Sequence, residues 1–152
     1  MRPIFALLIL FLGVSVQAQE SVWNRLAVST EYRYLGRNAA GLGFEYRIPH
    51  KDAMTCNVGV KAYYTSVEGK PKVVPQLNVE YGLFLVAGVS VTPYAVEPQL
   101  QFNVLNLFAL NMGYAIPIDK NRYFRGITFG VQFNIAVGKD SKYYDRLRMI
   151  GF

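Results

Sequence analysis

Histidine and cysteine are almost absent from the chain, which has one of each among its 152 residues, His50 and Cys56. Structural zinc sites take ~4 cysteine or histidine ligands, so a metal centre of this kind cannot form here. A single cysteine also leaves no partner for an internal disulfide, even in an oxidising compartment. We therefore expect no bound metal, no cofactor and no disulfide, and we interpret Cys56 as a small apolar side chain.

Charged residues are also scarce, at 17% of the chain against 52% hydrophobic residues. This composition excludes intrinsic disorder, which requires low hydrophobicity and high net charge. Beyond the N-terminus, no uncharged apolar run reaches the ~18 residues of a transmembrane helix, so a helical membrane protein is not expected. The length fits a single domain.

The N-terminus has the features of a secretory signal peptide at residues 1–18. Arg2 gives a short positive region, Ile4–Val14 an apolar region, and the tripeptide VQA (16–18) a cleavage site of small residues. We expect cleavage after this tripeptide, followed by a polar N-terminal lead-in at 19–24.

Removal of the signal peptide would leave 15 basic residues (16 minus Arg2) and 10 acidic residues, a net charge of +5. The excess is spread over loops and the C-terminal region. It does not form a basic face with interleaved aromatic residues, so nucleic acid is not an expected partner. Anionic lipid head groups are the partner that this charge favours.

Apolar and polar side chains alternate with a period of two along eight segments. In GITFGVQFNIAVG (126–138), Ile, Phe, Val, Phe, Ile and Val alternate with Thr, Gly, Gln, Asn and Ala, as in a strand with one apolar and one polar face. No apolar face carries a charged residue, and the opposite faces are rich in Asn, Gln and Gly. The other seven segments are 25–35, 41–48, 54–64, 73–81, 85–91, 96–104 and 108–116.

The lengths of these segments match tilted strands that cross a bilayer, which need ~9–11 residues. We therefore predict a β-barrel at 25–138 whose apolar faces meet lipid and whose small polar faces line a narrow interior. Short and longer connections alternate, as the turns and loops at the two ends of transmembrane barrels do. The short ones are 49–53, 82–84 and 105–107, and the mostly longer and more polar ones are 36–40, 65–71, 92–95 and 117–125.

Two prolines lie inside predicted strands, at Pro75 and Pro98. Proline lacks the N–H group, so it leaves a carbonyl on the neighbouring strand unpaired, which is unfavourable in lipid. We expect both residues near strand ends, at the level of the lipid head groups, where water can pair with that carbonyl.

The turn at Gly82 is weak, and residues 72–92 could instead form one long strand. Residues 142–152 would then be the last strand of the barrel. That alternative places Arg146 and Arg148 on the lipid face, where an arginine costs ~2–4 kcal/mol at the bilayer midplane. We therefore favour two strands separated by a turn at Gly82.

The chain resembles the small, porin-like, eight-stranded outer-membrane β-barrels of Gram-negative bacteria in its signal peptide, eight alternating segments, Tyr and Phe at strand ends, and terminal Phe152. The resemblance implies an all-β protein, an eight-stranded antiparallel up-and-down transmembrane β-barrel in the outer membrane. It also implies contact with outer-membrane lipid and with the outer-membrane assembly machinery, for which a C-terminal aromatic residue is typical. Residues 139–152 lack the alternation and form a C-terminal tail or, in the alternative register, the last strand. Within them, Tyr143, Leu147 and Ile150 have the spacing of a short interfacial helix.

The polar faces carry four acidic and four basic side chains that would point into the lumen. The interior of an eight-stranded barrel is just wide enough to be filled by side chains. Charges buried there must be paired and hydrogen-bonded, so we predict an ion-pair network that fills the lumen, with a selective pore or a proton-linked gate as the alternative. The eight residues are Arg25, Glu31, Arg33, Glu45, Arg47, Lys61, Glu80 and Glu97.

The connection from Asp119 to Arg125 is rich in basic and aromatic groups, which suit anionic lipopolysaccharide or a surface partner, although a solvated loop fits as well. Its candidate contact residues are Lys120, Arg122, Tyr123, Phe124 and Arg125. Six tyrosines on the apolar faces fit the aromatic girdle of a membrane interface. They are Tyr32, Tyr34, Tyr46, Tyr64, Tyr81 and Tyr114.

The leading functional hypothesis is a structural or surface-interaction role through the outer loops, without enzymatic activity. A secreted soluble barrel that binds an apolar ligand inside, with its apolar faces turned inward, is the first alternative. Some barrels that the chain resembles trim or transfer acyl chains of lipid A, so a lipid-modifying enzyme is the second alternative. Such hydrolysis needs a serine with a nearby base. His50 lies in the turn IPHKD, and Ser29 and Ser90 lie in mid-strand, so no catalytic residue is predicted.

Overall fold

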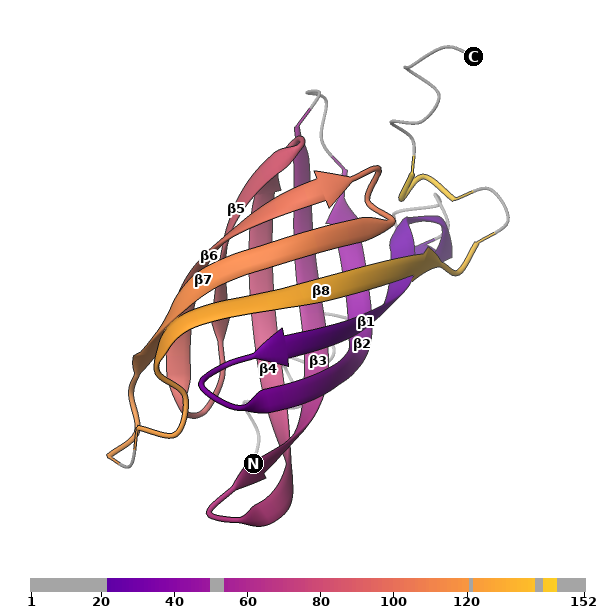
Figure 1. Cartoon of the computed structure of the whole chain (residues 1–152). Helices are drawn as coiled ribbons and strands as arrows, with labels where there is room; N and C mark the ends of the chain where they lie inside the picture. The colour runs from indigo at the N-terminus through magenta and orange to yellow at the C-terminus, as the bar shows by residue number, and fades with distance from the viewer. Residues whose placement is uncertain (1–21, 50–53, 121, 139–140, 145–152) are drawn as a thin grey trace, which may run out of the picture.

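The computed structural model describes residues 22–49, 54–120, 122–138 and 141–144. The predicted signal peptide, His50 and most of the predicted tail, including Phe152, lie outside the described residues. A short 3-10 helix, η1, precedes eight strands that form one closed barrel (Figure 1). The elements are η1 (Val22–Arg25), β1 (Leu26–Tyr34), β2 (Asn38–Ile48), β3 (Thr55–Val67), β4 (Lys70–Gly82), β5 (Leu85–Val91), β6 (Ala95–Val104), β7 (Phe108–Pro117) and β8 (Gly126–Ala136).

Every strand pairs antiparallel with its neighbours in sequence, and β8 closes the sheet on β1. This arrangement confirms the predicted fold class, an all-β, eight-stranded, antiparallel up-and-down barrel. Closure gives each strand a paired neighbour on both sides, which removes the free edges of an open sheet. Among the described residues, no helix is long and apolar enough to cross a membrane.

Alternation along the strands places polar side chains inside the barrel and apolar side chains outside. On β4, Gln76, Asn78 and Glu80 are buried, whereas Leu77 and Val79 are exposed. Successive Cβ atoms of a strand point to opposite faces, so a period of two in the sequence becomes an inner and an outer surface. The other strands repeat the pattern, which produces a polar lumen and an apolar outer face.

The two ends of the barrel differ in their connections. We name the loop end for the β1–β2, β3–β4, β5–β6 and β7–β8 connections, and the tail end for the other three together with residues 141–144. The β3–β4 hairpin extends furthest at the loop end (Figure 1), and Glu68 and Gly69 at its tip have φ values of 56° and 72°. The predicted polar connection at 65–71 is therefore wrong, because all of it except this tip is paired strand. Thr65 and Val67 continue the inward-facing alternation of β3.

The chain turns between β4 and β5, so residues 72–92 form two strands, as favoured from the sequence. A Cβ on Gly82 would overlap the carbonyl oxygen of Leu85, which explains why glycine stands at this turn. Thr55 Oγ1 donates a hydrogen bond to the carbonyl of Gly82 at 2.8 Å and holds the turn against β3. The alternative with 142–152 as the last strand is wrong, because β8 already pairs with both β7 and β1.

Both prolines lie inside their strands, so the expectation that they would lie near strand ends is also wrong. Pro75 pairs with Ala62 of β3, at a level of β4 that has no partner in β5. Pro98 is opposite Val89 of β5, but the β6–β7 ladder skips Glu97 and Pro98. The missing N–H of Pro98 accounts for a local gap of this kind.

A cluster of buried apolar side chains lies in the barrel at the loop end. Leu35 and Phe124 come from the connections, and Tyr63, Val67 and Val74 come from β3 and β4. Ala39, Ala95 and Ala115 complete the cluster. This cluster covers the polar part of the lumen on the loop side.

Candidate functional site

One hydrogen-bonded network fills the lumen, and Glu31 of β1 lies at its centre. The side chain of Glu31 is fully buried. A carboxylate can accept about four hydrogen bonds, and Glu31 reaches that number with donors from three strands. The donors are Arg33 Nη1 at 2.9 Å, Lys61 Nζ at 2.8 Å, Asn111 Nδ2 at 2.8 Å and the hydroxyl of Tyr63.

Lys61 of β3 connects β1, β2 and β8. Its Nζ lies 2.8 Å from Glu31 Oε2, 2.6 Å from Gln132 Oε1 and 3.1 Å from Glu45 Oε1. The first two contacts are hydrogen bonds and the third is an ion pair, although Lys61 is only 2% exposed. A buried charge is tolerated only when it is paired and hydrogen-bonded in this way.

Arg33 extends the network to β6. Its Nη2 lies 2.7 Å from Glu97 Oε1 and 2.5 Å from Gln99 Oε1. Glu97 also accepts hydrogen bonds from the hydroxyls of Thr128 on β8 and, at 3.3 Å, Ser90 on β5. Arg33 and Glu97 therefore connect the two sides of the barrel through its interior.

Glu80 of β4 joins the network through neutral amides. Its Oε1 accepts hydrogen bonds from Asn78 at 2.8 Å, Gln99 at 3.3 Å and Gln101 at 2.5 Å. Asn78 Nδ2 also donates to Glu45 Oε1 at 3.0 Å and so bridges two carboxylates. No ion pair within the described part of the chain involves Glu80. With Glu80 and Asn78 included, all eight strands contribute a side chain to the network.

Of the eight charged residues predicted for the lumen, the structure brings five together in ion pairs: Glu31, Arg33, Glu45, Lys61 and Glu97. Arg47 lies at the tail end of β2, where Nη1 donates to the carbonyls of Lys142 at 2.7 Å and Tyr143 at 3.0 Å. The predicted barrel of 25–138 placed Arg25 on the first strand. In the structure, Arg25 is the last residue of η1 and lies just before that strand.

Two buried tyrosines belong to the site, and the sequence predicted neither of them there. Tyr64 was predicted on the apolar face, and no role was predicted for its neighbour Tyr63. Tyr63 lies on the polar face of the same strand, two residues from Lys61 and opposite Gly41. Tyr143 lies in the predicted tail, yet it is fully buried, and its carbonyl accepts a hydrogen bond from Asn106 at 3.2 Å. Burial raises the pKa of Tyr143 well above its usual range. Period-two alternation gave a signal for Tyr63, whereas Tyr143 had none, because it follows the last strand.

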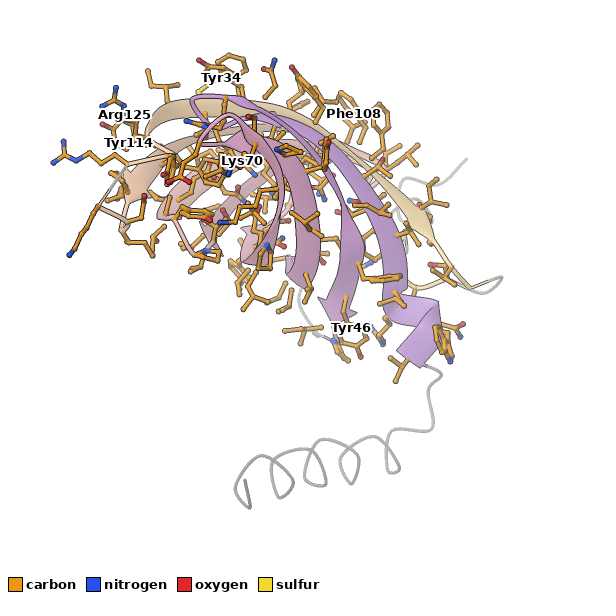
Figure 2. The ribbon with its side chains drawn as sticks, turned by 90° about the horizontal axis from the view of Figure 1, so that it is seen from below. Tyr34, Tyr46, Lys70, Phe108, Tyr114 and Arg125 are labelled. Carbon is orange, nitrogen blue, oxygen red and sulfur yellow. The ribbon has the colours of Figure 1, made fainter. Side chains whose placement is uncertain are left out.

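The loop end presents a cationic surface, which we name the loop-end basic surface and define as Arg37, Lys70, Lys72, Lys120, Arg122 and Arg125. Figure 2 shows Lys70 and Arg125 on the same side as Tyr34 and Tyr114, away from Tyr46 and Phe108. Two of its cations stack on aromatic rings, Arg37 over Tyr123 at 5.6 Å and Lys72 over Tyr94 at 5.2 Å. Such contacts hold the cationic side chains in defined positions.

The loop contact predicted at Lys120, Arg122, Tyr123, Phe124 and Arg125 needs one correction. Phe124 is fully buried in the apolar cluster and stacks edge-on against Tyr94 at 5.6 Å, so it offers no surface to a partner. Tyr123 is partly buried, and its hydroxyl donates to Glu68. The three basic residues are exposed.

The outer face of the barrel is apolar around its circumference. Ile127 is 67% exposed, Met112 and Leu85 are 65% exposed, and similar side chains cover every strand. Five of the six tyrosines predicted on this face are exposed, and Tyr46 is half-buried. Single exposed apolar residues are ordinary on a protein surface, whereas large continuous apolar patches mark sites of interaction with a protein, a ligand or a membrane.

Comparisons with known protein families, with curated proteins and with solved structures found no match. Within the described residues, no group of three or more His, Cys, Asp and Glu side chains could hold a metal ion. Function is therefore inferred from three features of the barrel: the filled lumen, the loop-end basic surface and the apolar outer face.

Proposed function

We propose that the chain is an outer-membrane β-barrel with a structural or surface-interaction role and no enzymatic activity. One observation carries the proposal: a closed barrel has an apolar outer face on every strand and a polar, hydrogen-bonded interior. Only helices and closed barrels satisfy all backbone groups within lipid, and this fold meets that condition. The signal peptide expected at residues 1–18 supports export, and the exposed tyrosines suit the two interfaces of a bilayer.

The two alternative functions fit the structure less well. A soluble barrel for an apolar ligand needs an apolar cavity, but buried Gln, Asn, Glu and Lys side chains fill this interior. A lipid-modifying enzyme needs an accessible nucleophile, but Ser29 is fully buried, and Ser90 is buried and donates to Glu97. Neither serine is reachable from the outer face or from solvent.

The orientation that we infer has the loop end outside the cell and the tail end in the periplasm. Longer loops of outer-membrane barrels face outward and shorter turns face the periplasm. The partners would be outer-membrane lipid, the assembly machinery that inserts barrels and, at the loop end, anionic lipopolysaccharide or a surface partner. The loop-end basic surface supports this last partner, since it has six cations against the acids Glu68 and Asp119.

Membrane fractionation combined with gel mobility tests the main proposal. The outer membrane is isolated and washed with urea or carbonate, and the protein is run on a gel with and without boiling. Retention in the membrane together with heat-dependent mobility is expected for a stable transmembrane barrel. Release into the soluble periplasmic fraction without a mobility change would reject the lipid-facing assignment.

Binding of lipopolysaccharide tests the loop-end partner separately. The triple variant Lys70→Ala, Lys120→Ala, Arg125→Ala should reduce the amount of lipopolysaccharide that copurifies with the folded barrel. The acidic residues of the same end provide a control, because Glu68→Gln with Asp119→Asn should keep or increase it. Equal amounts in all three proteins would leave the barrel assignment intact and remove lipopolysaccharide as the loop ligand.

A further inference from the structure

A groove lies on the outer face of the barrel at the loop end, between β1, β2 and the β3–β4 hairpin. Its volume is about 490 Å³, which falls within the ~300–1,000 Å³ that is typical of small-molecule sites. The exposed side chains that line it are Tyr32, Asn38, Ala40, Tyr64, Ser66 and Pro71. All six belong to the outward-facing set of their strands, so the groove opens to the surroundings of the barrel and is separate from the filled lumen.

The apolar part of the groove is a slot between two tyrosine rings. Ala40 of β2 pairs with Tyr32 of β1 on one side and with Tyr64 of β3 on the other. The two tyrosines are 55% and 62% exposed, and the alanine between them has only a methyl group. Neighbouring strands lie ~4.8 Å apart, so the two tyrosine backbones are ~9–10 Å apart and leave room for one hydrocarbon chain above the alanine.

Polar groups line the part of the groove nearest the loop end. The β2–β3 ladder ends at the pair of Ala39 and Thr65, so the β3–β4 hairpin continues past β2 and forms a raised wall there (Figure 1). Backbone carbonyls at this step are satisfied, since Thr65 Oγ1 donates to that of Asn38 at 2.7 Å. The side-chain amide of Asn38 and the hydroxyl of Ser66 are exposed and make no hydrogen bond with a described residue, which leaves both available to a ligand.

Arg37 gives this end of the groove a positive charge. Its Nη1 donates to the backbone carbonyl of Ser66, a lining residue, and its guanidinium carbon lies 5.6 Å from the centre of the Tyr123 ring. These two contacts hold the guanidinium in place, and Arg37 forms no ion pair with a described acid. Glu68, at the tip of the hairpin, accepts a hydrogen bond from Tyr123, and no acid lines the described groove. Arginine in such a setting suits a phosphate group.

We propose that this groove binds the lipid A part of one lipopolysaccharide molecule, with an acyl chain between Tyr32 and Tyr64, sugar hydroxyls at Asn38 and Ser66, and a phosphate at Arg37. The inference rests on the proposed outer-membrane location, which places the groove at the level of the outer leaflet.

The polar end of the groove selects the lipid. Lipid chains are as apolar as the side chains around them, so packing in the slot does not by itself distinguish one lipid from another. A cation next to uncharged hydrogen-bonding groups favours a phosphorylated sugar. This site differs from the loop-end basic surface as a whole, because Arg37 is the one member of that surface that contacts a lining residue through a described hydrogen bond.

Native mass spectrometry tests the site, because it counts the lipids that remain bound to each folded chain. The full processed chain in mild detergent is titrated separately with bisphosphorylated lipid A, with dephosphorylated lipid A and with phosphatidylglycerol. Saturable binding of one bisphosphorylated lipid A per chain is expected, at least tenfold tighter than binding of either other lipid. Equal binding of phosphatidylglycerol would overturn the proposal, since it would show contact with lipid of any kind.

Two variants locate the bound lipid. Ala40→Leu fills the slot and is expected to weaken binding of bisphosphorylated lipid A at least tenfold, whereas the matched Ala87→Leu, at an exposed alanine of β5 outside the groove, should leave it unchanged. Arg37→Gln should weaken binding of bisphosphorylated lipid A and leave dephosphorylated lipid A unaffected. Heat-dependent gel mobility confirms that each variant is folded, and Ala40→Leu is sufficient for the test if Arg37→Gln does not fold.

The proposal is overturned if Ala40→Leu binds lipid A as tightly as Ala87→Leu does. That result would leave the barrel assignment and the loop-end basic surface in place, because membrane fractionation and the triple variant test them independently.

Discussion

Tyr63 of β3 lies directly across the β2–β3 ladder from Gly41, and its ring occupies the space of the side chain that glycine lacks. A Cβ on Gly41 would be 2.6 Å from Tyr63 Cε1 and 2.8 Å from Cδ1. The glycine lets the ring lie against β2 while the hydroxyl donates to Glu31. This pair therefore connects the apolar cluster of the loop end to the ion-pair network below it.

Substitution of this glycine should destabilise the barrel through the tyrosine ring alone. Gly41→Ala is expected to lower the free energy of unfolding by ~1–3 kcal/mol, because the added methyl group displaces the ring. The same substitution in a Tyr63→Ala background should cost much less, since the ring is gone. Urea titration of the four proteins in detergent, read by heat-dependent gel mobility, measures the difference. An equal cost in both backgrounds would mean that the contact is not what requires glycine.

Removal of the central cation should be among the most damaging single changes in the lumen. Lys61→Met leaves Glu31 and Glu45 without their shared counter-charge, and breaking a buried pair in this way costs ~3–5 kcal/mol. The exposed Lys70→Met at the loop end is the control, with an expected change of ~0–1 kcal/mol. Adding Glu31→Gln to Lys61→Met should recover part of the loss in the same urea assay. Similar unfolding midpoints for the two lysine variants would contradict the role of the network.

The outer face offers a test that depends on the solvent around it. Leu100 is 53% exposed in the middle of β6, and Ile118 is 57% exposed just beyond β7. In a bilayer, Leu100→Arg should destabilise the barrel by ~2–4 kcal/mol and Ile118→Arg by ~0–1 kcal/mol, because the cost of a lipid-facing arginine depends on depth. Folding titrations into lipid vesicles measure both values. A harmless Leu100→Arg would indicate that water surrounds this face.

Alkaline pH should destabilise the barrel partly through Tyr143. Burial keeps the folded pKa of this phenol well above its usual range, so the neutral form is favoured in the folded protein. Its contribution to stability is complete below the unfolded pKa of about 10 and falls above it by up to ~1.4 kcal/mol per pH unit. Tyr143→Phe removes this dependence, so the wild type should lose stability more steeply between pH 10 and 11 than the variant does. Parallel slopes would show that the phenol ionises freely in the folded state.

Strand positions were predictable because they follow from side-chain alternation alone. Apolar and polar residues must alternate along a half-buried strand, and each of the eight segments has one face without charge. This pattern was enough to predict two strands separated by a turn at Gly82. Lengths were less predictable, because the β3–β4 hairpin continues beyond the apolar pattern through backbone pairing. The position of Pro98 could not be inferred, because the β6–β7 ladder accommodates it by leaving out Glu97 and Pro98. No residue type in the sequence predicts this gap.

The site residues were predictable where a charged residue stands on the polar face of a strand. They were not predictable where tertiary packing determines the position of a side chain. Glu31 and Lys61 stood on polar faces, so their burial followed from the barrel itself. Phe124 lies in a basic loop of the sequence and was predicted to be at the surface. In the structure it packs into the apolar cluster, because burial of its ring removes apolar area from water. Tyr143 is buried at the tail end, where its backbone carbonyl accepts a hydrogen bond from Asn106, and no local sequence pattern predicts this contact.

The hydrogen-bonded network also ties β3 and β6 to the last strand, β8. Lys61 finds an acceptor in Gln132 of β8, and Glu97 accepts from Thr128 of the same strand. Until β8 pairs, the charged groups of Lys61 and Glu97 can satisfy these hydrogen bonds only with water. Barrel assembly is therefore expected to be a single committed event near its finish, in which water leaves the interior as the final strand joins the first.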